Sequence, residues 1–541
     1  MRTGHKVFVR EATGLVREIG AVETIAFNSG AWMPFFGIMY VLVFTLYSVP
    51  AVDIVLAWSV GAILGLITNV SYGMVMSAFP RSGAAYVAGS RLVHPAWGFM
   101  MEGAQWFLQT ACGAMTVMML VLSGISPSVA VAGAILNDPG LTAFSTMLMN
   151  PMVVLLISTV VVVVVALVSM LGVRIVMRYF LLPAWIIEIV GMVVIAGILA
   201  GQSGQGFISA FNNFVIRGGG PSGAYSTIIS AAKEAGMPAT TGASAWQFVL
   251  AVGLSWSAVV GANWAHPIAG EVRRGSLPRT WMIINLVSAG LTSLIVILTS
   301  GLLLRMAGKD FLAAFNYLSI AKPEALPIPS FGGAFVALFI GIISPNLFTI
   351  ALIVITAVAT VVAILPQFVM ITTRPLFAFA FDGLLPRAIA DVSDRFHTPV
   401  KAISIWAVVT EVFLVGLAVP GPFADAYWVL WAAVLGGATI PLGMLTVYGV
   451  ILPFKKKYWE TSPLKYHKGT LLITSIIGMI FLEFLAVPAY LLGPGMGSSV
   501  SAVQVTILIF AVALAYFWIA RAYRKSQGID LDLAFKELPP E

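Results

Sequence analysis

One apolar stretch near the start of this sequence is interrupted by residues that break or loosen helices. In residues 25–37, IAFNSGAWMPFFG, the sequence Asn28-Ser29-Gly30 is followed by Pro34. Proline lacks an amide hydrogen and clashes with the preceding turn, so we expect the helix to be broken here. Amide groups freed at the start of a half-helix favour an anion such as a carboxylate, whereas carbonyls freed at the end of one favour an ammonium group or Na⁺.

A second interruption lies in residues 254–267, LSWSAVVGANWAHP, which contain Ser257, Gly261, Asn263 and Pro267. Interrupted helices at corresponding positions of two halves of a membrane protein point to a binding site near the middle of the bilayer, and such a site can hold both ends of a zwitterion. The alternative is that Gly, Ser and Pro serve here only as packing and kink residues. We predict that a small solute is bound by Asn28, Ser29, Gly30, Ala31, Ser257, Ala258, Val259, Gly261 and Asn263.

Acidic residues inside apolar stretches are the second group of candidates. Glu102, Glu188, Glu411 and Glu483 each lie within such a stretch, and Glu23 lies near the start of the first one. An ionised carboxylate in hydrocarbon costs at least ~2.5–3.5 kcal/mol, so these groups face water or the interior of a helix bundle. We predict that Glu188 and Glu102 carry a coupling proton. The alternative for each is a protonated carboxyl group that is hydrogen-bonded to a neighbouring helix.

Catalytic and metal-binding patterns do not emerge from the sequence. The five histidines lack the spacing of metal ligands, and neither a Walker A loop nor a dinucleotide fingerprint occurs. Thr356 and Thr360 form a possible Na⁺ site, but threonines that bond to their own helix backbone are the favoured interpretation. We therefore expect neither an enzyme nor a bound cofactor.

The elements that must position these groups are membrane helices. Hydrophobic residues make up 60% of the chain, only 9% of residues are charged, and the mean hydropathy is +0.99; a soluble domain is about 25% charged. Apolar runs of about 20 residues suffice to cross the bilayer as helices. Twelve such segments are predicted, at residues 21–47, 54–79, 97–123, 150–172, 179–201, 246–268, 280–304, 344–372, 402–420, 427–453, 469–492 and 502–520.

The basic residues predict the orientation of these segments. If the N-terminus is cytoplasmic, 24 of the 29 Lys and Arg residues fall in the two tails and in the loops on the cytoplasmic side. This is the bias of the positive-inside rule, so both termini are predicted to be cytoplasmic. The net charge of +7 then reflects the basic residues of the cytoplasmic loops and tails, and nucleic-acid binding is not expected.

Two long connections are predicted on the outer side, at residues 202–245 and 305–343. The first contains a possible short amphipathic helix at 225–235. The second ends in the apolar stretch Phe331–Ile343, which is too short to span a membrane. Two interpretations stay open for that stretch: a helix packed over the outer mouth, or an extension of the eighth span.

Four motifs run through the chain: LVREIG at 15–20, FPRSGAAYVAGSRLVHPAWGF at 79–99, AGEVRRGSLPRTW at 269–281 and TTRPLFAFAFDGLLPRAIADVSDRFHTPVKAI at 372–403. At these residues the chain resembles the amino acid–polyamine–organocation superfamily of permeases. The resemblance implies an all-α membrane fold with a five-plus-five inverted repeat, discontinuous helices 1 and 6, and two further C-terminal helices. It also implies uptake or exchange of amino acids or related amines.

The resemblance also bears on single residues. Gly261 matches the glycine of the broken sixth helix, and Asn263 falls where many members have glutamate. Relatives have a carboxylate-binding Gly-Ser-Gly where this chain has Pro34-Phe35-Phe36. Three interpretations stay open: the usual carboxylate contacts are lost, the pocket is larger or shaped differently, or the break is shifted toward Ser29–Met33. Some proton-coupled members have a lysine near the position of Glu188. In this chain the ionisable group is an acid, so binding of the coupling proton would remove a negative charge instead of creating a positive one.

The predicted function is secondary active transport of amino acids or amines in the cell membrane, by alternating access. Spans 1, 2, 6 and 7 are expected to rock against spans 3, 4, 8 and 9. Proton coupling is favoured; a Na⁺-coupled symporter or an exchanger of the same fold is the alternative, and a channel or a transporter-like sensor is the alternative of another class. The predicted parts are a cytoplasmic segment (1–20), a first repeat (21–201), an outer connection (202–245), a second repeat (246–453), helices 11 and 12 (454–520) and a cytoplasmic tail (521–541).

Overall fold

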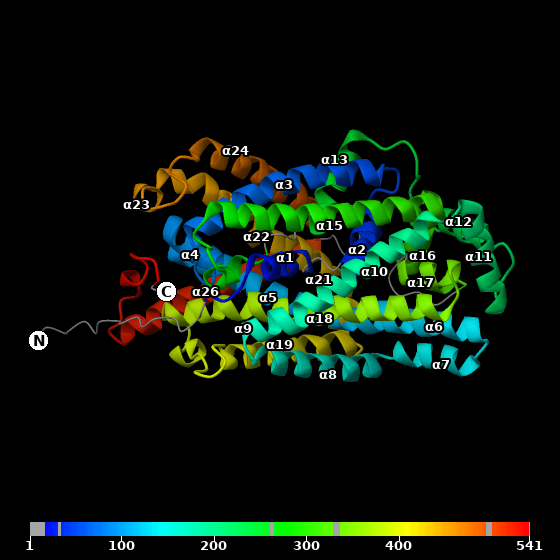
Figure 1. Cartoon of the computed structure of the whole chain (residues 1–541), viewed down its shortest axis with the longest axis horizontal. Coiled ribbons are helices and arrows are strands. Elements are labelled where there is room, and N and C mark those ends of the chain that lie inside the picture. The colour runs from blue at the N-terminus through cyan, green and yellow to red at the C-terminus, as the bar shows by residue number, and fades with distance from the viewer. Residues whose placement is uncertain (1–16, 31–33, 260–263, 328–335, 494–499, 540–541) are drawn as a thin grey trace, which may run out of the picture.

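The computed structural model describes residues 17–30, 34–259, 264–327, 336–493 and 500–539. Within these ranges the chain is helical, and only an isolated bridge between Ile19 and Val272 has extended pairing. The helices run side by side along the long axis of the molecule (Figure 1). Ten of the described helices are long and apolar enough to cross a membrane: Ile54–Ala78 (α3), Pro95–Gly133 (α5 into α6), Pro151–Ser169 (α8), Val173–Ala200 (α9 to α10), Pro278–Ala307 (α15), Leu347–Phe381 (α18), Val400–Ala418 (α19), Tyr427–Phe454 (α21 to α22 and the turn after it), Lys468–Leu491 (α24 to α25) and Val500–Ser526 (α26).

These ten helices coincide with ten of the twelve predicted segments. The other two predicted segments are the ones with interruptions. The first consists of α1 (Ala21–Gly30) and α2 (Pro34–Ser48), and the sixth contains α13 (Ala245–Leu254) and the short α14 (Trp256–Val259). Residues 31–33 and 260–263 lie outside the described residues, so the predicted site residues Ala31, Gly261 and Asn263 have no structural description.

Two helices run nine or more residues past their predicted ends. The third span continues past residue 123 through a wide turn at Leu120–Ile125 into α6 (Ser126–Leu136). Pro127 stands in the first turn of α6, where the missing amide hydrogen is tolerated. The eighth span continues past residue 372 to Phe381, because Arg374 is not a loop residue but a buried side chain with an acidic partner.

One end of the molecule is covered by short helices. These are α11 (Gly204–Arg217), α12 (Ala224–Glu234), α16 (Lys309–Ala321) and α17 (Val336–Ile343), which lie at the right of Figure 1. The helix α12 confirms the prediction for residues 225–235. Because residues 344–346 separate α17 from α18, the described part of the apolar stretch, residues 336–343, is a separate, buried helix and not an extension of the eighth span.

Aromatic side chains join the short helices at this end. The ring of Phe311 in α16 lies 5.0 Å from that of Phe211 in α11 and stacks on that of Tyr225 in α12 at 4.5 Å. Phe339 in α17 lies 5.5 Å from Phe207 in α11. Such pairs add stability beyond the area they bury, so the four helices form one cohesive cover.

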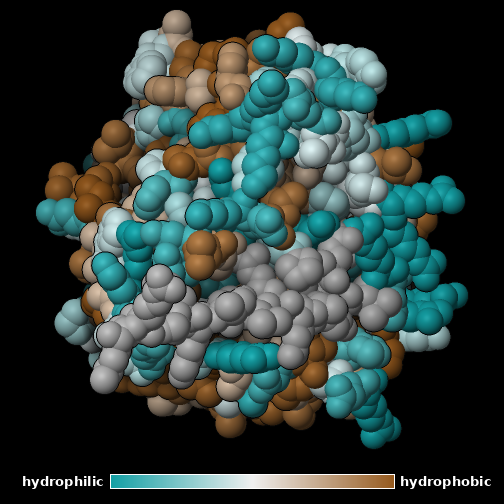
Figure 2. Space-filling view, turned by 90° about the vertical axis from the view of Figure 1, so that its left-hand side faces the viewer, coloured by the Kyte–Doolittle hydropathy of each residue, from teal (hydrophilic) through white to brown (hydrophobic). Residues whose placement is uncertain are grey.

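The opposite end carries α4 (Ala84–Leu92), α23 (Lys456–Trp459) and the C-terminal residues 531–539. Figure 2 shows that hydrophilic side chains spread over this end. The amide of Ile19 donates to the carbonyl of Glu271 at 3.0 Å and that of Arg273 donates to Ile19 at 2.9 Å, so the entry to α1 pairs with the chain after the sixth span.

The interior is arranged around α1 and α2, the two described helices of the first span. Helix α1 packs between α15 on one side and α10 (Leu182–Ala200) and α18 on the other, and α2 contacts the same three helices. Helices α10 and α18 also pack on each other. A Cβ atom at Gly191 would overlap the side chain of Thr356, so glycine at this position allows the close approach of α10 and α18.

Candidate functional site

The two interrupted spans meet at Asn28. Its Oδ1 atom accepts a hydrogen bond from the amide of Ala265 at 2.9 Å, just beyond the second interruption. Its Nδ2 atom donates to Oδ1 of Asn285 in α15 at 3.2 Å, and Asn285 in turn donates to the carbonyl of Asn69 in α3 at 3.2 Å. Asn28 is fully buried. One asparagine network therefore joins the first, second, sixth and seventh spans, and the side chain of Asn28 is engaged by the protein itself.

Ser29 and Gly30 end the first half-helix. The hydroxyl group of Ser29 donates to the carbonyl of Ile25 in its own helix at 2.6 Å. A Cβ atom at Gly30 would lie 3.1 Å from Nε2 of Gln367 in α18 and 3.5 Å from Cδ1 of Trp185 in α10. The interruption therefore faces the helix pair α10 and α18.

The described part of the second interruption is α14, which contains Ser257, Ala258 and Val259. The hydroxyl group of Ser257 lies 2.5 Å from that of Tyr490 in α25 (Val487–Leu491). Tyr490 also donates to the carbonyl of Leu254, the last residue of α13, at 2.7 Å. The structure thus places Ser257 against the eleventh span. The helix α14 itself packs against α2 and α15, so the two interrupted spans are neighbours.

Glu188 is the predicted residue with the most informative surroundings. It is fully buried in α10. Its Oε1 atom accepts from the hydroxyl group of Thr360 in α18 at 3.0 Å and from the amide of Phe35, in the first turn of α2, at 3.4 Å. Its Oε2 atom has no hydrogen-bond partner among the described residues. A carboxyl group of the fifth span thus contacts the second half of the broken first span.

Glu102 lies in α5, and its Oε1 atom is 3.9 Å from Nε2 of His266, just after the second interruption. Both side chains are buried, so this pair spans the contact between the third and sixth spans. Glu411 in α19 accepts from Thr159 in α8 at 2.8 Å, which is the hydrogen-bonded alternative weighed for such acids.

The hydroxyl oxygen atoms of Thr356 and Thr360 lie 2.7 and 2.8 Å from carbonyls of their own helix, those of Leu352 and Thr356. This is the geometry of packing threonines. Among the described residues, the side chains of His, Cys, Asp and Glu form no cluster of three that would hold a metal ion.

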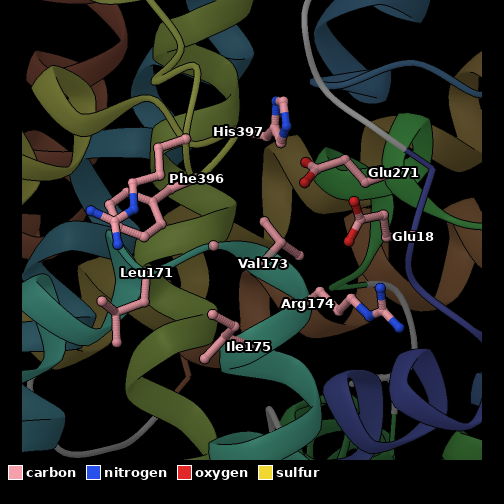
Figure 3. A pocket seen from close by; sticks show the side chains of 10 residues that line it. Glu18, Leu171, Val173, Arg174, Ile175, Glu271, Phe396 and His397 are labelled. Atoms are coloured by element: carbon pink, nitrogen blue, oxygen red, sulfur yellow. The ribbon is translucent and has the colours of Figure 1, made fainter.

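A pocket of about 300 Å³ opens at the end of the molecule that carries the C-terminal residues. Glu18 and Glu271 line one side, from the entry to the first span and the chain after the sixth (Figure 3). Residues 171–175, between the fourth and fifth spans, and 395–397, between the eighth and ninth, line the other. The pocket therefore separates segments of the two predicted moving parts.

Two buried ion pairs join the sequence motifs at this end. Arg374 in the 372–403 motif makes two hydrogen bonds to Glu271 of the 269–281 motif, at 2.8 and 2.9 Å. Arg91 of the 79–99 motif makes two to Asp382 in the 372–403 motif, at 2.8 and 3.1 Å. All four side chains are almost fully buried. Sequence analysis placed these arginines in loops and did not predict their pairing.

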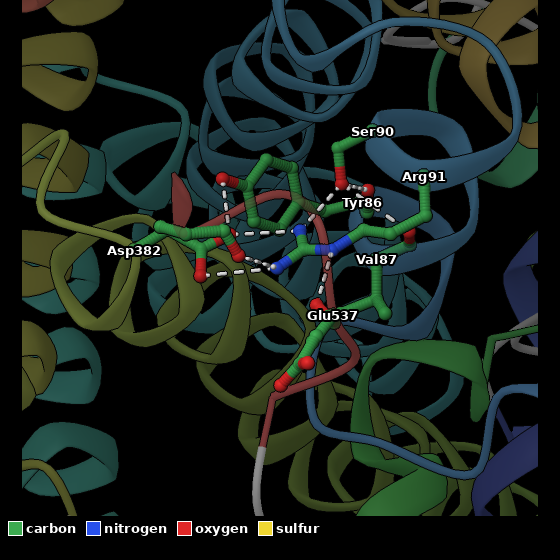
Figure 4. A network of polar contacts seen from close by, with 7 residues as sticks. Tyr86, Val87, Ser90, Arg91, Asp382 and Glu537 are labelled. Carbon is green, nitrogen blue, oxygen red and sulfur yellow. Dashed lines mark hydrogen bonds and ion pairs between the residues drawn. The ribbon is translucent and has the colours of Figure 1, made fainter. Parts of the chain in front are cut away.

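The pair of Arg91 and Asp382 is further enclosed (Figure 4). Tyr86 donates to Asp382 at 2.9 Å, and Nε of Arg91 donates to the carbonyl of Glu537 at 3.4 Å. Burial lowers the pKa of Arg91, but the charge and hydrogen bonds of Asp382, together with Tyr86 and Tyr458, raise it by more, so the net pKa lies above its usual value. The guanidinium group thus stays charged and attaches the C-terminal segment to α4.

Several residues around the interruptions were not predicted. Asn285, Trp185 and Gln367 carry no pattern in the sequence, because single polar or aromatic residues are common in membrane helices. Their spacing is the signal that was available: Trp185 and Glu188 lie three residues apart on α10, and Thr360 and Gln367 lie seven apart on α18, so each pair shares a helix face.

The comparison with protein families matches residues 19–512 to the model described as amino acid permease. The chain belongs to the amino acid permease family. The match covers both interruptions, Glu188 and three of the four motifs completely. A search among curated proteins gave no significant match.

Membership identifies this permease as a multi-pass membrane transporter and not an enzyme. It implies transport of amino acids. The resemblance stated from the four motifs is therefore confirmed at the level of the family, and the apolar helices agree with it.

Proposed function

We propose that this permease moves amino acids or related amines across the cell membrane by alternating access, with the solute bound between the interruptions of the first and sixth spans. The observation that carries the proposal is the contact of Glu188 in α10 with the amide of Phe35 in α2. It places a titratable group of the fifth span directly on the broken first span. A change in its protonation would thus alter the contact between the two.

The proposed motion follows the asparagine network and the pocket. Spans 1, 2, 6 and 7 share the hydrogen bonds of Asn28 and Asn285 and would move as one body. The pocket at the C-terminal end lies between segments of this body and segments of the other spans. It would widen into the route by which the solute leaves toward the cytoplasm, where both termini are proposed to lie.

Proton coupling is proposed to work through Glu188, assisted by Glu102. Glu188 has one oxygen atom held by Phe35 and Thr360 and a second without a described partner, so a proton can bind the second oxygen atom while the hydrogen bonds to the first weaken. The alternatives within the fold are Na⁺ symport, in which Thr356 and Thr360 would take part, and exchange. The proposed repeats, residues 21–201 and 246–453, would carry equivalent halves of the site.

Uptake into proteoliposomes tests the proposal. Labelled amino acids and amines are offered with an inward proton gradient, an inward Na⁺ gradient, or neither. We expect saturable uptake that the proton gradient stimulates and that Ser257→Trp and Gly261→Trp abolish while the protein remains monodisperse. Normal uptake by both variants would refute the site. A channel would instead conduct without saturation, and a sensor would transport nothing across the panel.

A further inference from the structure

The amino end of helix α2 already carries an anion from the protein. The described part of α2 begins at Pro34, which has no amide hydrogen, so Phe35 supplies the first amide hydrogen of this part. That amide donates to Oε1 of Glu188 at 3.4 Å. The start of a helix attracts negative charge, and a carboxylate is the group expected to bind there. In this chain the carboxylate is part of α10.

The second oxygen atom of this carboxyl group is left for something else. Oε2 of Glu188 is buried and has no hydrogen-bond partner among the described residues. Residues 18–48, which include α1 and α2, and the helix α10 contain no Lys, Arg or His. A buried carboxylate is tolerated when it is paired, and no Lys, Arg or His among the described residues forms an ion pair with Glu188.

The charged and titratable groups of the elements packed against α10 either bond to other residues or lie at the ends of their helices. From the helices packed against α10, Arg374 pairs with Glu271, Arg305 bonds to the carbonyl of Ala200, and Tyr47 stacks on Tyr317. Four further groups lie in the first or last turn of a helix or in the turn before α10: Glu23, Arg279, Arg178 and Tyr179. The side chain of Tyr40 is not described. None of these groups has a contact with Glu188 in the described residues.

The remaining groups at the interruption suit a cation. Oε1 of Gln367 has no described partner, whereas its Nε2 atom donates to the carbonyl of Ala363 at 2.9 Å. The Cδ1 atom of Trp185 lies close to the same Gly30 as Nε2 of Gln367 does. An open carbonyl-type oxygen atom and an indole ring both attract an ammonium group.

We propose that Glu188 takes the place of a solute carboxylate at the start of α2, so that this permease recognises the ammonium group of its solute, through Oε2 of Glu188, and does not require an α-carboxylate. The inference rests on the proposed function and names the determinant of specificity within it. Glu188 is a binding residue for the solute as well as a coupling residue.

Matched pairs of compounds that differ only in the carboxylate test this inference: lysine and cadaverine, ornithine and putrescine, tyrosine and tyramine. Binding to the full-length protein in detergent is measured by calorimetry. In each pair that binds, we expect the amine to bind at least as tightly as its parent amino acid. Tighter binding of the amino acid in every such pair would overturn the inference and leave the proposed function standing.

Substitutions separate the role of Glu188 from a general effect on folding. Glu188→Gln keeps the acceptor for Phe35 and Thr360 but loses the charge, and we expect the affinity for the amine to fall at least tenfold. Glu188→Ala removes the anion from the start of α2, so the preference should shift toward the parent amino acid. Glu411→Gln is the matched control, an intramembrane acid bonded to Thr159, and should bind as the wild type does.

The outcomes are distinguishable. An amine affinity in Glu188→Gln within twofold of the wild type would overturn the inference. If Glu188→Ala does not fold, the wild-type pairs and Glu188→Gln still decide it. If no compound of any pair binds or enters proteoliposomes, the proposed function fails as well.

Discussion

Replacement of Asn28 by alanine tests the link between the two interrupted spans. Asn28 accepts a hydrogen bond from the amide of Ala265 and donates one to Asn285. Asn28→Ala removes both bonds at once. The amide of Ala265, which belongs to a fully buried residue, would lose the partner that it has in the structure.

The expected cost follows from these two contacts. A net intramolecular hydrogen bond contributes about 1 kcal/mol, and a buried donor left without a partner costs ~1–3 kcal/mol. Together, Asn28→Ala should destabilise the fold by roughly 2–4 kcal/mol. Asn69→Ala is the matched control. That side chain is equally buried but donates only to the carbonyl of Gly65 in its own helix, at 2.9 Å, so about 1 kcal/mol or less is expected.

Reversible unfolding in mixed micelles of increasing denaturing detergent measures both variants. We expect Asn28→Ala to lose more stability than Asn69→Ala by about 1–3 kcal/mol, and to lose transport in parallel, because its spans would no longer move together. A double substitution with Asn285→Ala should cost less than the sum of the single ones. Equal losses for Asn28→Ala and Asn69→Ala would refute the reasoning.

Two further predictions concern the acids. Glu271→Gln leaves the guanidinium group of Arg374 buried without its charged partner, so the free energy of unfolding should fall by about 3–5 kcal/mol. Glu271→Leu combined with Arg374→Met removes both charges and should recover most of this loss. Similar stability of the single and the double variant would contradict this prediction. Glu188→Gln should abolish the stimulation of uptake by an inward proton gradient while exchange without a gradient persists. Unchanged stimulation in liposome assays would reject Glu188 as the coupling group.

Much of the fold was predictable from apolar length and charge. The ten uninterrupted spans coincide with described helices, because hydrocarbon imposes a minimum length that composition reveals directly. The ends of helices were less predictable. Arg374 was assigned to a loop because charges are usually excluded from spans, but the residue that neutralises it, Glu271, lies 103 positions away in the chain. Such a distant pairing has no local signal.

The site was predictable in part. Proline and glycine predict both interruptions. The described helices α1 and α2 border residues 31–33 and α14 borders residues 260–263, which lie outside the described residues, so both breaks stay predictions. Glu188 stood out as an acid in an apolar span, yet its contact with Phe35 depends on the packing of α10 against α2, which periodicity alone cannot specify. Ser257 was assigned to the solute, whereas its described partner is Tyr490; its place on the solute stays a prediction.

Solute uptake by two glycine variants tests most directly whether the solute lies at the interruption of the first span. Gly30 faces Gln367 and Trp185, whereas a Cβ atom at Gly290 in α15 would meet no atom within 4 Å. We predict that Gly30→Trp blocks uptake in proteoliposomes and that Gly290→Trp does not, while both proteins remain monodisperse. If Gly30→Trp does not fold, Gly30→Ala serves as the milder variant. Wild-type uptake by Gly30→Trp would contradict the account.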